Sequence, residues 1–255
     1  MKTSPLDAFP LKQYGHNLTQ VAREGVFAPV GGYEAAMARI FQILLRRGKD
    51  NNKYNPLLLD LDEGRRWRVV SEVVRRIAAG GAPAPLPIRE VIALNYEALF
   101  AKDAASQRRR AMGESQRPSP NENEWELALA DAASDEMFEQ FVKKYFSGNL
   151  WPELEEWNPP NEVLSRLQEL FLAVRQSEGQ ILLFVDHFHT LVGGDQQPYH
   201  IDASGLLKSV LARREIQLIA ACTPAQYQQY IERDAAISRR MQEFDVRSDE
   251  ELQVS

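Results

Sequence analysis

Short apolar runs alternate along the chain with longer segments whose apolar residues recur every three or four positions. Runs of consecutive apolar residues rich in Ile, Leu and Val predict buried strands, and they fall at 57–61, 89–96, 181–186 and 215–222. The amphipathic segments predict helices at 16–25, 33–47, 66–78, 161–176 and 203–213. Strands that alternate with helices predict an α/β fold, in which helices cover both faces of a parallel sheet.

One long segment, residues 102–160, interrupts this alternation and predicts an insertion that is partly disordered and partly helical. Its polar, Pro-containing part covers 113–124, and an amphipathic helical pattern covers 125–146. The segment is acidic and carries aromatic residues, which are enriched at protein interfaces. The candidates for binding a partner are Trp125, Phe138, Phe141 and Trp151. The same side chains are equally expected to fill a small core of the insertion itself.

Composition narrows the class of protein. The chain has 255 residues, 44% of them hydrophobic, so it can bury a sizeable core. The net charge of -6 argues against nucleic acid as a partner. A single cysteine, Cys222, excludes an internal disulfide and suits a reducing compartment. We find neither a signal peptide nor an apolar run long enough to cross a membrane, so we expect a cytoplasmic protein.

Three stretches carry a resemblance to a known family. They are YGHNLTQVAREGVFAPVGGYEAAMARIFQILLRRGK at 14–49, ILLFVDHFHTLVG at 181–193 and DASGLLKSVLARREIQLIAACTPAQYQQYIERDAAISRRMQ at 202–242. In this order they resemble the first ATPase module of the Clp-type AAA+ unfoldases and disaggregases. The match runs from about residue 11 to 247, apart from the insertion.

The resemblance implies a Rossmann-like AAA+ large subdomain, a three-layer αβα fold with a parallel five-stranded sheet. Residues 1–101 and 161–247 would form this subdomain, 102–160 would be the insertion and 248–255 a tail. It also implies that the family's small helical subdomain, N-terminal domain, middle domain and second ATPase module are missing from this chain.

The family's phosphate-binding loop corresponds to DLDEGRRW, residues 60–67. Asp60 and Arg65 replace the two glycines that let the backbone approach phosphates, and Gly64 is the only glycine left in this remnant loop. Arg66 replaces the lysine, and Trp67 replaces the threonine whose hydroxyl would bind magnesium. The three carboxylates of this segment would repel a polyphosphate. The sequence therefore predicts an ordinary strand-to-helix turn.

Other nucleotide-related positions are partly kept. Asp186 matches the aspartate that supports magnesium, but His187 stands at the position of the catalytic glutamate. Cys222 and Thr223 fall at the sensor position, where one hydroxyl survives. His189 matches a histidine of the family itself. We expect no metal site at these histidines, because no third ligand is evident near them in the sequence.

Arg239 and Arg240 match a pair of arginine fingers, which act on the nucleotide of a neighbouring subunit. A solvated, charged helix end is an equally good interpretation. Residues 97–112 lack the aromatic-glycine loop that grips substrate in the family. We therefore expect that substrate threading has been lost.

Two functions remain open. The first is a noncatalytic AAA+ protein without a cofactor, acting as an adaptor, regulator or assembly partner of another protein, either an active Clp-type subunit or a second copy of itself. The alternative is a divergent chaperone-related protein that still binds ATP and magnesium weakly. A decayed gene product is a third, weaker interpretation.

Overall fold

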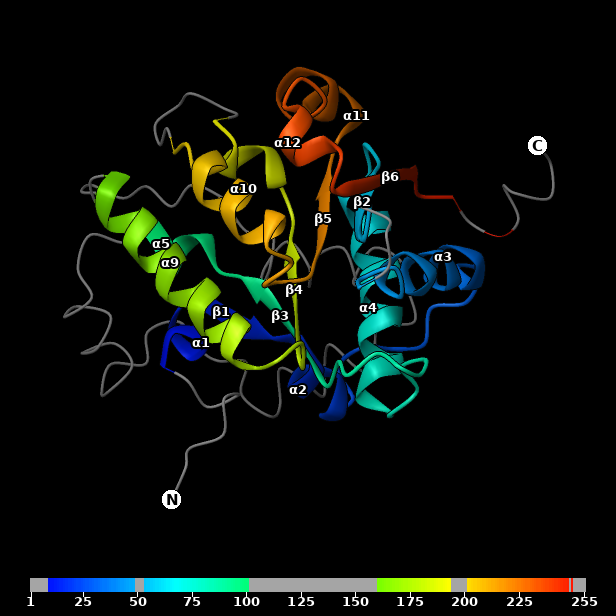
Figure 1. The fold of residues 1–255 in the computed structure, drawn as a ribbon. Helices are drawn as coiled ribbons and strands as arrows, with labels where there is room; N and C mark the ends of the chain where they lie inside the picture. The colour runs from blue at the N-terminus through cyan, green and yellow to red at the C-terminus, as the bar shows by residue number, and fades with distance from the viewer. Residues whose placement is uncertain (1–8, 49–52, 101–159, 194–200, 248, 250–255) are drawn as a thin grey trace.

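The computed structural model describes residues 9–48, 53–100, 160–193, 201–247 and 249. Trp125, Phe138, Phe141 and Trp151 lie outside the described residues, as does the predicted insertion except for its last residue. In the described part, a twisted sheet lies between two layers of helices (Figure 1). The division of the chain into subdomain, insertion and tail remains a prediction.

The sheet has six strands within the described residues, in the order β1-β3-β4-β5-β2-β6. Their bounds are β1 Gly15–Asn17, β2 Asn55–Leu59, β3 Glu90–Leu94, β4 Ile181–Val185, β5 Leu218–Cys222 and β6 Met241–Asp245. Five strands are parallel to their neighbours in the sheet, in the order β3, β4, β5, β2 and β6. Strand β1 pairs with β3 in the antiparallel direction. The expected five-stranded parallel sheet is present, and β1 adds a sixth, antiparallel strand at its edge.

Helices cover both faces of this sheet. The main ones are α1 Phe9–Tyr14, α2 Leu18–Arg23, α3 Glu34–Leu44, α4 Glu63–Ala78, α9 Pro160–Gln176 and α10 Ser204–Ala212. Figure 1 shows α9 and α10 on one side of the strands and α3 and α4 on the other. Shorter elements are α5 Tyr96–Phe100, the 3₁₀ helix η2 Phe188–Leu191, α11 Pro224–Gln226, the π-helical turn η3 Tyr227–Ile231 and α12 Ala235–Ser238.

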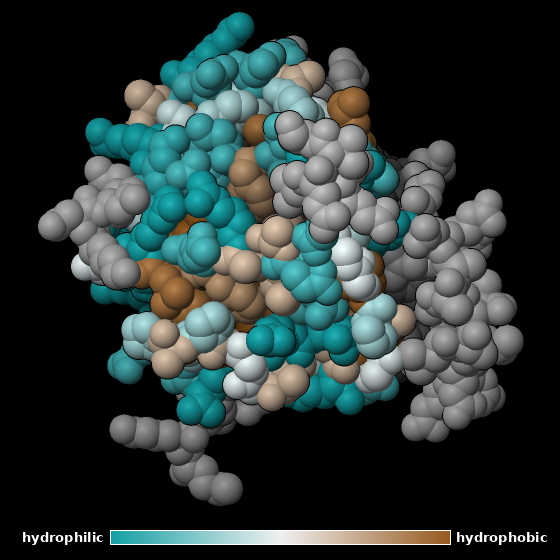
Figure 2. All heavy atoms as spheres, turned by 90° about the vertical axis from the view of Figure 1, so that its right-hand side faces the viewer, coloured by the Kyte–Doolittle hydropathy of each residue, from teal (hydrophilic) through white to brown (hydrophobic). Residues whose placement is uncertain are grey.

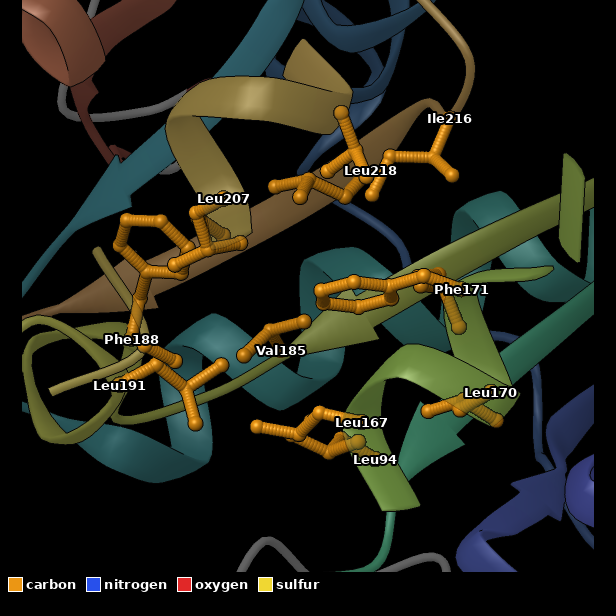
Figure 3. Packing of buried hydrophobic residues seen from close by; sticks show 14 of the residues in the cluster. Leu94, Leu167, Leu170, Phe171, Val185, Phe188, Leu191, Leu207, Ile216 and Leu218 are labelled. Atoms are coloured by element: carbon orange, nitrogen blue, oxygen red, sulfur yellow. The ribbon is translucent and has the colours of Figure 1, made fainter. Parts of the chain in front are cut away.

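Strand residues alternate between two hydrophobic clusters. In β4, Leu183 and Val185 join the cluster beneath α9 and α10, whereas Leu182 and Phe184 join the cluster beneath α3 and α4. Figure 3 shows Val185 facing Leu167 and Phe171 of α9. Because successive strand residues point to opposite faces, the residue after Val185 is expected on the α4 side. That residue is Asp186.

Two predicted elements near the N-terminus and after β3 differ from the structure. The segment predicted as one helix over 16–25 begins instead as strand β1, and the Asn17 side chain accepts a hydrogen bond from the Gln20 amide to start α2. Strand β3 ends at Leu94, earlier than predicted, because the Asn95 side chain accepts from the Ala98 amide and starts α5. In both places a short polar side chain satisfies a helix N-terminus.

Helix α4 begins at Glu63, three residues before the predicted start. The Asp62 side chain caps it by accepting a hydrogen bond from the Arg65 amide at 3.2 Å. Only residues 60–62 connect β2 to α4, so five of the eight residues aligned with the phosphate loop are helical.

The surface on the side of α3 and β6 is mostly hydrophilic, and its apolar residues form small separate patches (Figure 2). The large apolar residues that stand exposed among those described are Leu61 and Leu172. None of the described helices is long and apolar enough to cross a membrane.

Candidate functional site

The first turn of α4 meets the C-terminal end of β4 through a buried ion pair. Arg66 Nη2 lies 3.2 Å from Asp186 Oδ1, and the side chains of Arg66 and Asp186 are only 2% and 9% exposed. Arg66 Nε donates to the same oxygen at 3.3 Å, and Nη1 donates to the Asp60 carbonyl at 2.6 Å. The two residues predicted from the nucleotide motifs, Arg66 and Asp186, are therefore paired with each other inside the protein.

The connection between β2 and α4 uses its own carboxylates as hydrogen-bond acceptors. Asp60 Oδ1 accepts from the Asp62 amide at 2.9 Å, and Asp62 caps α4. Asp60 Oδ2 also lies 3.5 Å from Arg65 Nε. An anion binds well at a helix N-terminus because free amides point toward it. Here acidic side chains already engage two of those amides.

His187 extends the site toward solvent. Its backbone has φ 46°, a left-handed conformation that is uncommon outside glycine. Its amide donates to Asp186 Oδ1 at 2.8 Å, and its ring Nε2 lies 3.3 Å from Glu63 Oε1. Burial alone would lower the pKa of His187, but the hydrogen bond to Glu63 and the nearby Asp186 charge outweigh it and raise that pKa.

Tyr96 closes the inner side of the site. Its hydroxyl donates to the Asp186 carbonyl at 2.9 Å. Burial, and then the Asp186 charge, raise the pKa of Tyr96 well above its ordinary value, so the hydroxyl stays protonated and remains a donor. Beside it is a small cavity of about 20 Å³, whose polar lining includes Asp186 and His187. This volume suffices for about one water molecule.

The other residues predicted from the nucleotide motifs make contacts within the fold. The Trp67 ring is buried and meets Phe184 edge-to-face, with ring centroids 4.8 Å apart. Cys222 is fully buried at the end of β5. The Thr223 hydroxyl accepts from the Gln226 amide and caps α11. Gly64 is buried within the first turn of α4.

The two arginines predicted as fingers have different surroundings. Arg239 is exposed at the C-terminal end of α12. Arg240 is buried, and its carbonyl accepts from the backbone and side-chain nitrogens of Asn55 at the start of β2. Only Arg239 is placed where a neighbouring molecule would reach its guanidinium.

His187 and His189 have different surroundings, although their rings are close. The rings of His187 and His189 are 6.0 Å apart, and His189 is buried and stacks against Tyr230. The expectation that no third potential ligand lies near His187 is wrong, because the early start of α4 brings Glu63 to it. Sequence reasoning counted Glu63 only among the carboxylates that would repel a polyphosphate, and it gave Tyr96 no role in the site. The Asp62 capping position before α4 was the signal that would have moved the helix start.

A shallow hollow of about 470 Å³ lies nearby, at the C-terminal ends of β2 and β6. Ligands of open α/β sheets bind at this edge. The hollow is lined by Leu59, Asp60, Leu61, Arg65, Pro224, Asp245, Val246 and Arg247.

The strand order and the position of this site define a Rossmann-like AAA+ fold. The chain is 33% identical over 233 residues to the chaperone protein ClpB of Gloeobacter violaceus, and 31% identical over 240 residues to that of Nitratidesulfovibrio vulgaris. These matches cover 91% and 94% of this chain. The chain spans about a fifth of the length of these relatives.

Solved structures agree on the fold. The Hsp104–ADP complex of S. cerevisiae superposes with a TM-score of 0.58 at 22% identity, over 93% of this chain and 30% of that one. The Hsp104:casein complex in its extended conformation gives 0.57 at 22% identity, with the same coverage. No family profile matches the chain. By sequence and by fold, the chain is a homologue of the Clp-type AAA+ proteins.

Proposed function

We propose that this chain is a noncatalytic Clp-like AAA+ domain that acts by binding another protein, as an adaptor, regulator or assembly partner. The observation that carries the proposal is the buried ion pair between Arg66 and Asp186. These residues stand at the positions of the phosphate-binding lysine and the magnesium-supporting aspartate of related modules. In this chain they bind each other.

Releasing Arg66 toward a phosphate would leave the Asp186 carboxylate buried without its partner. Loss of one member of a buried pair costs about 3–5 kcal/mol, a large fraction of the stability of a domain. Nucleotide binding would have to supply this free energy before it gained any affinity.

The acidic connection before α4 adds a second obstacle. Its Asp60 and Asp62 carboxylates accept hydrogen bonds from amides that a phosphate would need. They also carry the same sign of charge as a polyphosphate. Trp67 offers no oxygen to a magnesium ion and is instead packed on Phe184. These residues do not fit bound ATP and magnesium.

A protein partner is supported by the class of relative. The relatives are named as chaperones, and an Hsp104 structure includes casein. Exposed Arg239 is suited to reach an acidic surface on an active Clp-type subunit or on a second copy of this chain. Residues 102–160, with Trp125 and Trp151, are the other candidate surface.

The nucleotide half of the proposal is tested by calorimetry and thermal melting with Mg-ATP and Mg-ADP, together with a turnover assay. We expect no binding heat, no change in Tm and no hydrolysis. The matched comparison is a variant that carries Asp60→Gly, Arg65→Gly, Arg66→Lys and Trp67→Thr. If this variant binds nucleotide and the natural chain does not, the four loop residues are the cause of the lost binding. The proposal is refuted if the natural chain hydrolyses ATP and Asp186→Ala abolishes this hydrolysis.

The partner half is tested by affinity capture of the intact chain, of an Arg239→Ala variant and of a chain lacking residues 102–160. Loss of the same identified partner in one of the two altered chains would assign the binding surface. Capture of no protein by any of the three would contradict an adaptor role.

The second candidate function is weak nucleotide binding in the hollow at the ends of β2 and β6. Arg65 and Arg247 line it, each paired with a carboxylate of the same hollow, Asp60 and Asp245, so a phosphate would have to compete with these carboxylates for the arginines. A Tm rise with Mg-ADP that is lost in Arg247→Ala would favour this function over the first.

A further inference from the structure

Glu63, Asp186 and His187 bring three potential metal ligands together. One oxygen of each carboxylate and one nitrogen of the imidazole all lie within 4.8 Å of one another. We propose that these three side chains bind a divalent transition-metal ion of the zinc class, without any nucleotide. The proposal does not depend on whether the chain binds ATP.

The spacing of two ligands already suits such an ion. His187 Nε2 and Glu63 Oε1 are 3.3 Å apart. Bonds of about 2.0–2.2 Å to a tetrahedral zinc ion place two ligand atoms roughly 3.4 Å apart. The separations that involve Asp186 are at most 4.8 Å and would adjust to the ion by rotation of the carboxylate side chains.

Asp186 has one oxygen available for the ion. Its Oδ1 takes part in the ion pair with Arg66 and accepts from the His187 amide. Its Oδ2 is buried and has no hydrogen-bond partner. A buried carboxylate oxygen without a partner is costly, and a metal ion would satisfy it.

The backbone and the cavity complete the geometry. His187 has a left-handed backbone conformation, and its amide donates a hydrogen bond to the Asp186 carboxylate. With the backbone held in this way, the ring lies next to Glu63. The cavity of about 20 Å³ beside Asp186 and His187 has room for a water molecule as a fourth ligand.

Charge sets the kind of ion and limits its affinity. Two carboxylates against the Arg66 guanidinium leave one net negative charge, and His187 would bind the ion as a neutral imidazole, so the ion displaces any proton on the ring. Arg66 repels a cation, so we expect weaker binding than at a site made of thiolates. An imidazole ligand favours zinc or cobalt over magnesium or calcium.

The test uses the 255-residue chain without an affinity tag, stripped of metal by a chelator. Zinc is titrated in competition with a chromophoric chelator, and cobalt is followed by its visible absorption. We expect one zinc ion per chain, a cobalt spectrum typical of nitrogen and oxygen ligands, and no competition by magnesium. Glu63→Gln and His187→Asn are each expected to weaken zinc binding at least about tenfold, because each removes a ligand.

The matched control is Glu72→Gln, which removes a carboxylate from the same helix, where Glu72 pairs with Arg75. It is expected to bind zinc as the natural chain does, and circular dichroism checks that all variants are folded. The proposal is overturned if the natural chain binds no stoichiometric zinc. It is equally overturned if either site variant binds zinc as tightly as the control.

Discussion

Arg66 of helix α4 and Asp186 at the end of strand β4 form an ion pair of 3.2 Å, although 120 residues separate them in the chain. The pair ties the first turn of the central helix to the middle of the sheet. Successive residues of β4 point to opposite faces of the sheet, so Asp186 faces α4. Helix α4 begins at Glu63, and Arg66 in its first turn is buried against the sheet. The stability of the domain is therefore expected to depend on both residues together.

Replacing one partner of this pair is expected to destabilise the protein strongly. Asp186→Asn leaves the Arg66 charge buried, and Arg66→Met leaves the Asp186 charge buried, so each should cost about 3–5 kcal/mol in the free energy of unfolding. The double variant should cost clearly less than the sum, because it leaves no unpaired charge. Urea denaturation of the four proteins measures this coupling, and additive losses would show that the two side chains do not interact.

Cys222 is expected to be inert in the folded protein. Burial is the main cause that raises the pKa of its thiol to about 12, so almost none of it is thiolate at pH 8. Labelling by a thiol reagent should be at least about a hundredfold slower in the folded protein than in urea. Rapid labelling without denaturant would contradict the buried position at the end of β5.

The same thiol makes stability depend on alkaline pH. Below pH 9.0, the ordinary value, the thiol is protonated in both states and its contribution is fully present. As the pH rises toward about 12, the unfolded chain ionises first, so that contribution is lost. Relative to Cys222→Ala, the natural chain should therefore lose free energy of unfolding over this range. A difference that stays constant with pH would contradict the raised pKa.

The predictability of each element follows from how its residues are buried. Strand β4 was predicted almost to the residue, because ILLFV is buried on both faces and leaves no polar position to confuse the pattern. Strand β6 was missed, because it lies at the edge of the sheet and carries Gln242 and Glu243 in a half-exposed run. An edge strand is only partly buried and needs few apolar residues, so the apolar pattern of its sequence does not predict it.

The site was predictable in part for a similar reason. Its members Arg66, Asp186 and His187 follow from the strand–turn–helix pattern and the resemblance. The contacts of Glu63 and Tyr96 with residues 186 and 187 span 124 and 90 positions along the chain. Such contacts depend on where α4 begins and where β3 ends, and helix and strand boundaries are the least certain part of a sequence-based prediction.

Asp249 is expected to stabilise the start of α3. Its two carboxylate oxygens accept from the amides of Glu34 and Ala35, each at 3.0 Å, and its own amide donates to the Gly32 carbonyl. Asp249→Ala should cost about 1 kcal/mol as a lost helix cap, and Asp249→Asn should cost less because its amide oxygen still accepts. Chemical denaturation measures both, and equal stability of all three proteins would exclude the cap.

The pH dependence of this cap has the opposite sign to that of Cys222. Hydrogen bonds with Glu34, and with the amides of Glu34 and Ala35, lower the pKa of Asp249 below its ordinary 3.8. The stabilisation is therefore present above pH 3.8 and lost as the pH falls through the lowered value. The difference between the natural chain and Asp249→Ala should shrink in that acidic range.

Gly15 in strand β1 is expected to tolerate no side chain. A Cβ atom there would clash with Cγ2 of Ile92 and lie 2.9 Å from the Leu11 carbonyl oxygen. Gly15→Ala should destabilise the protein by about 1–3 kcal/mol, because β1 must move away from β3. The matched control is Gly205→Ala in α10, where a Cβ atom would meet nothing within 4 Å, and where alanine should stabilise the helix by about 0.5–1 kcal/mol. Thermal and urea denaturation compare the two variants. If Gly15→Ala is as stable as the natural chain, β1 is not packed against β3 as closely as the structure places it.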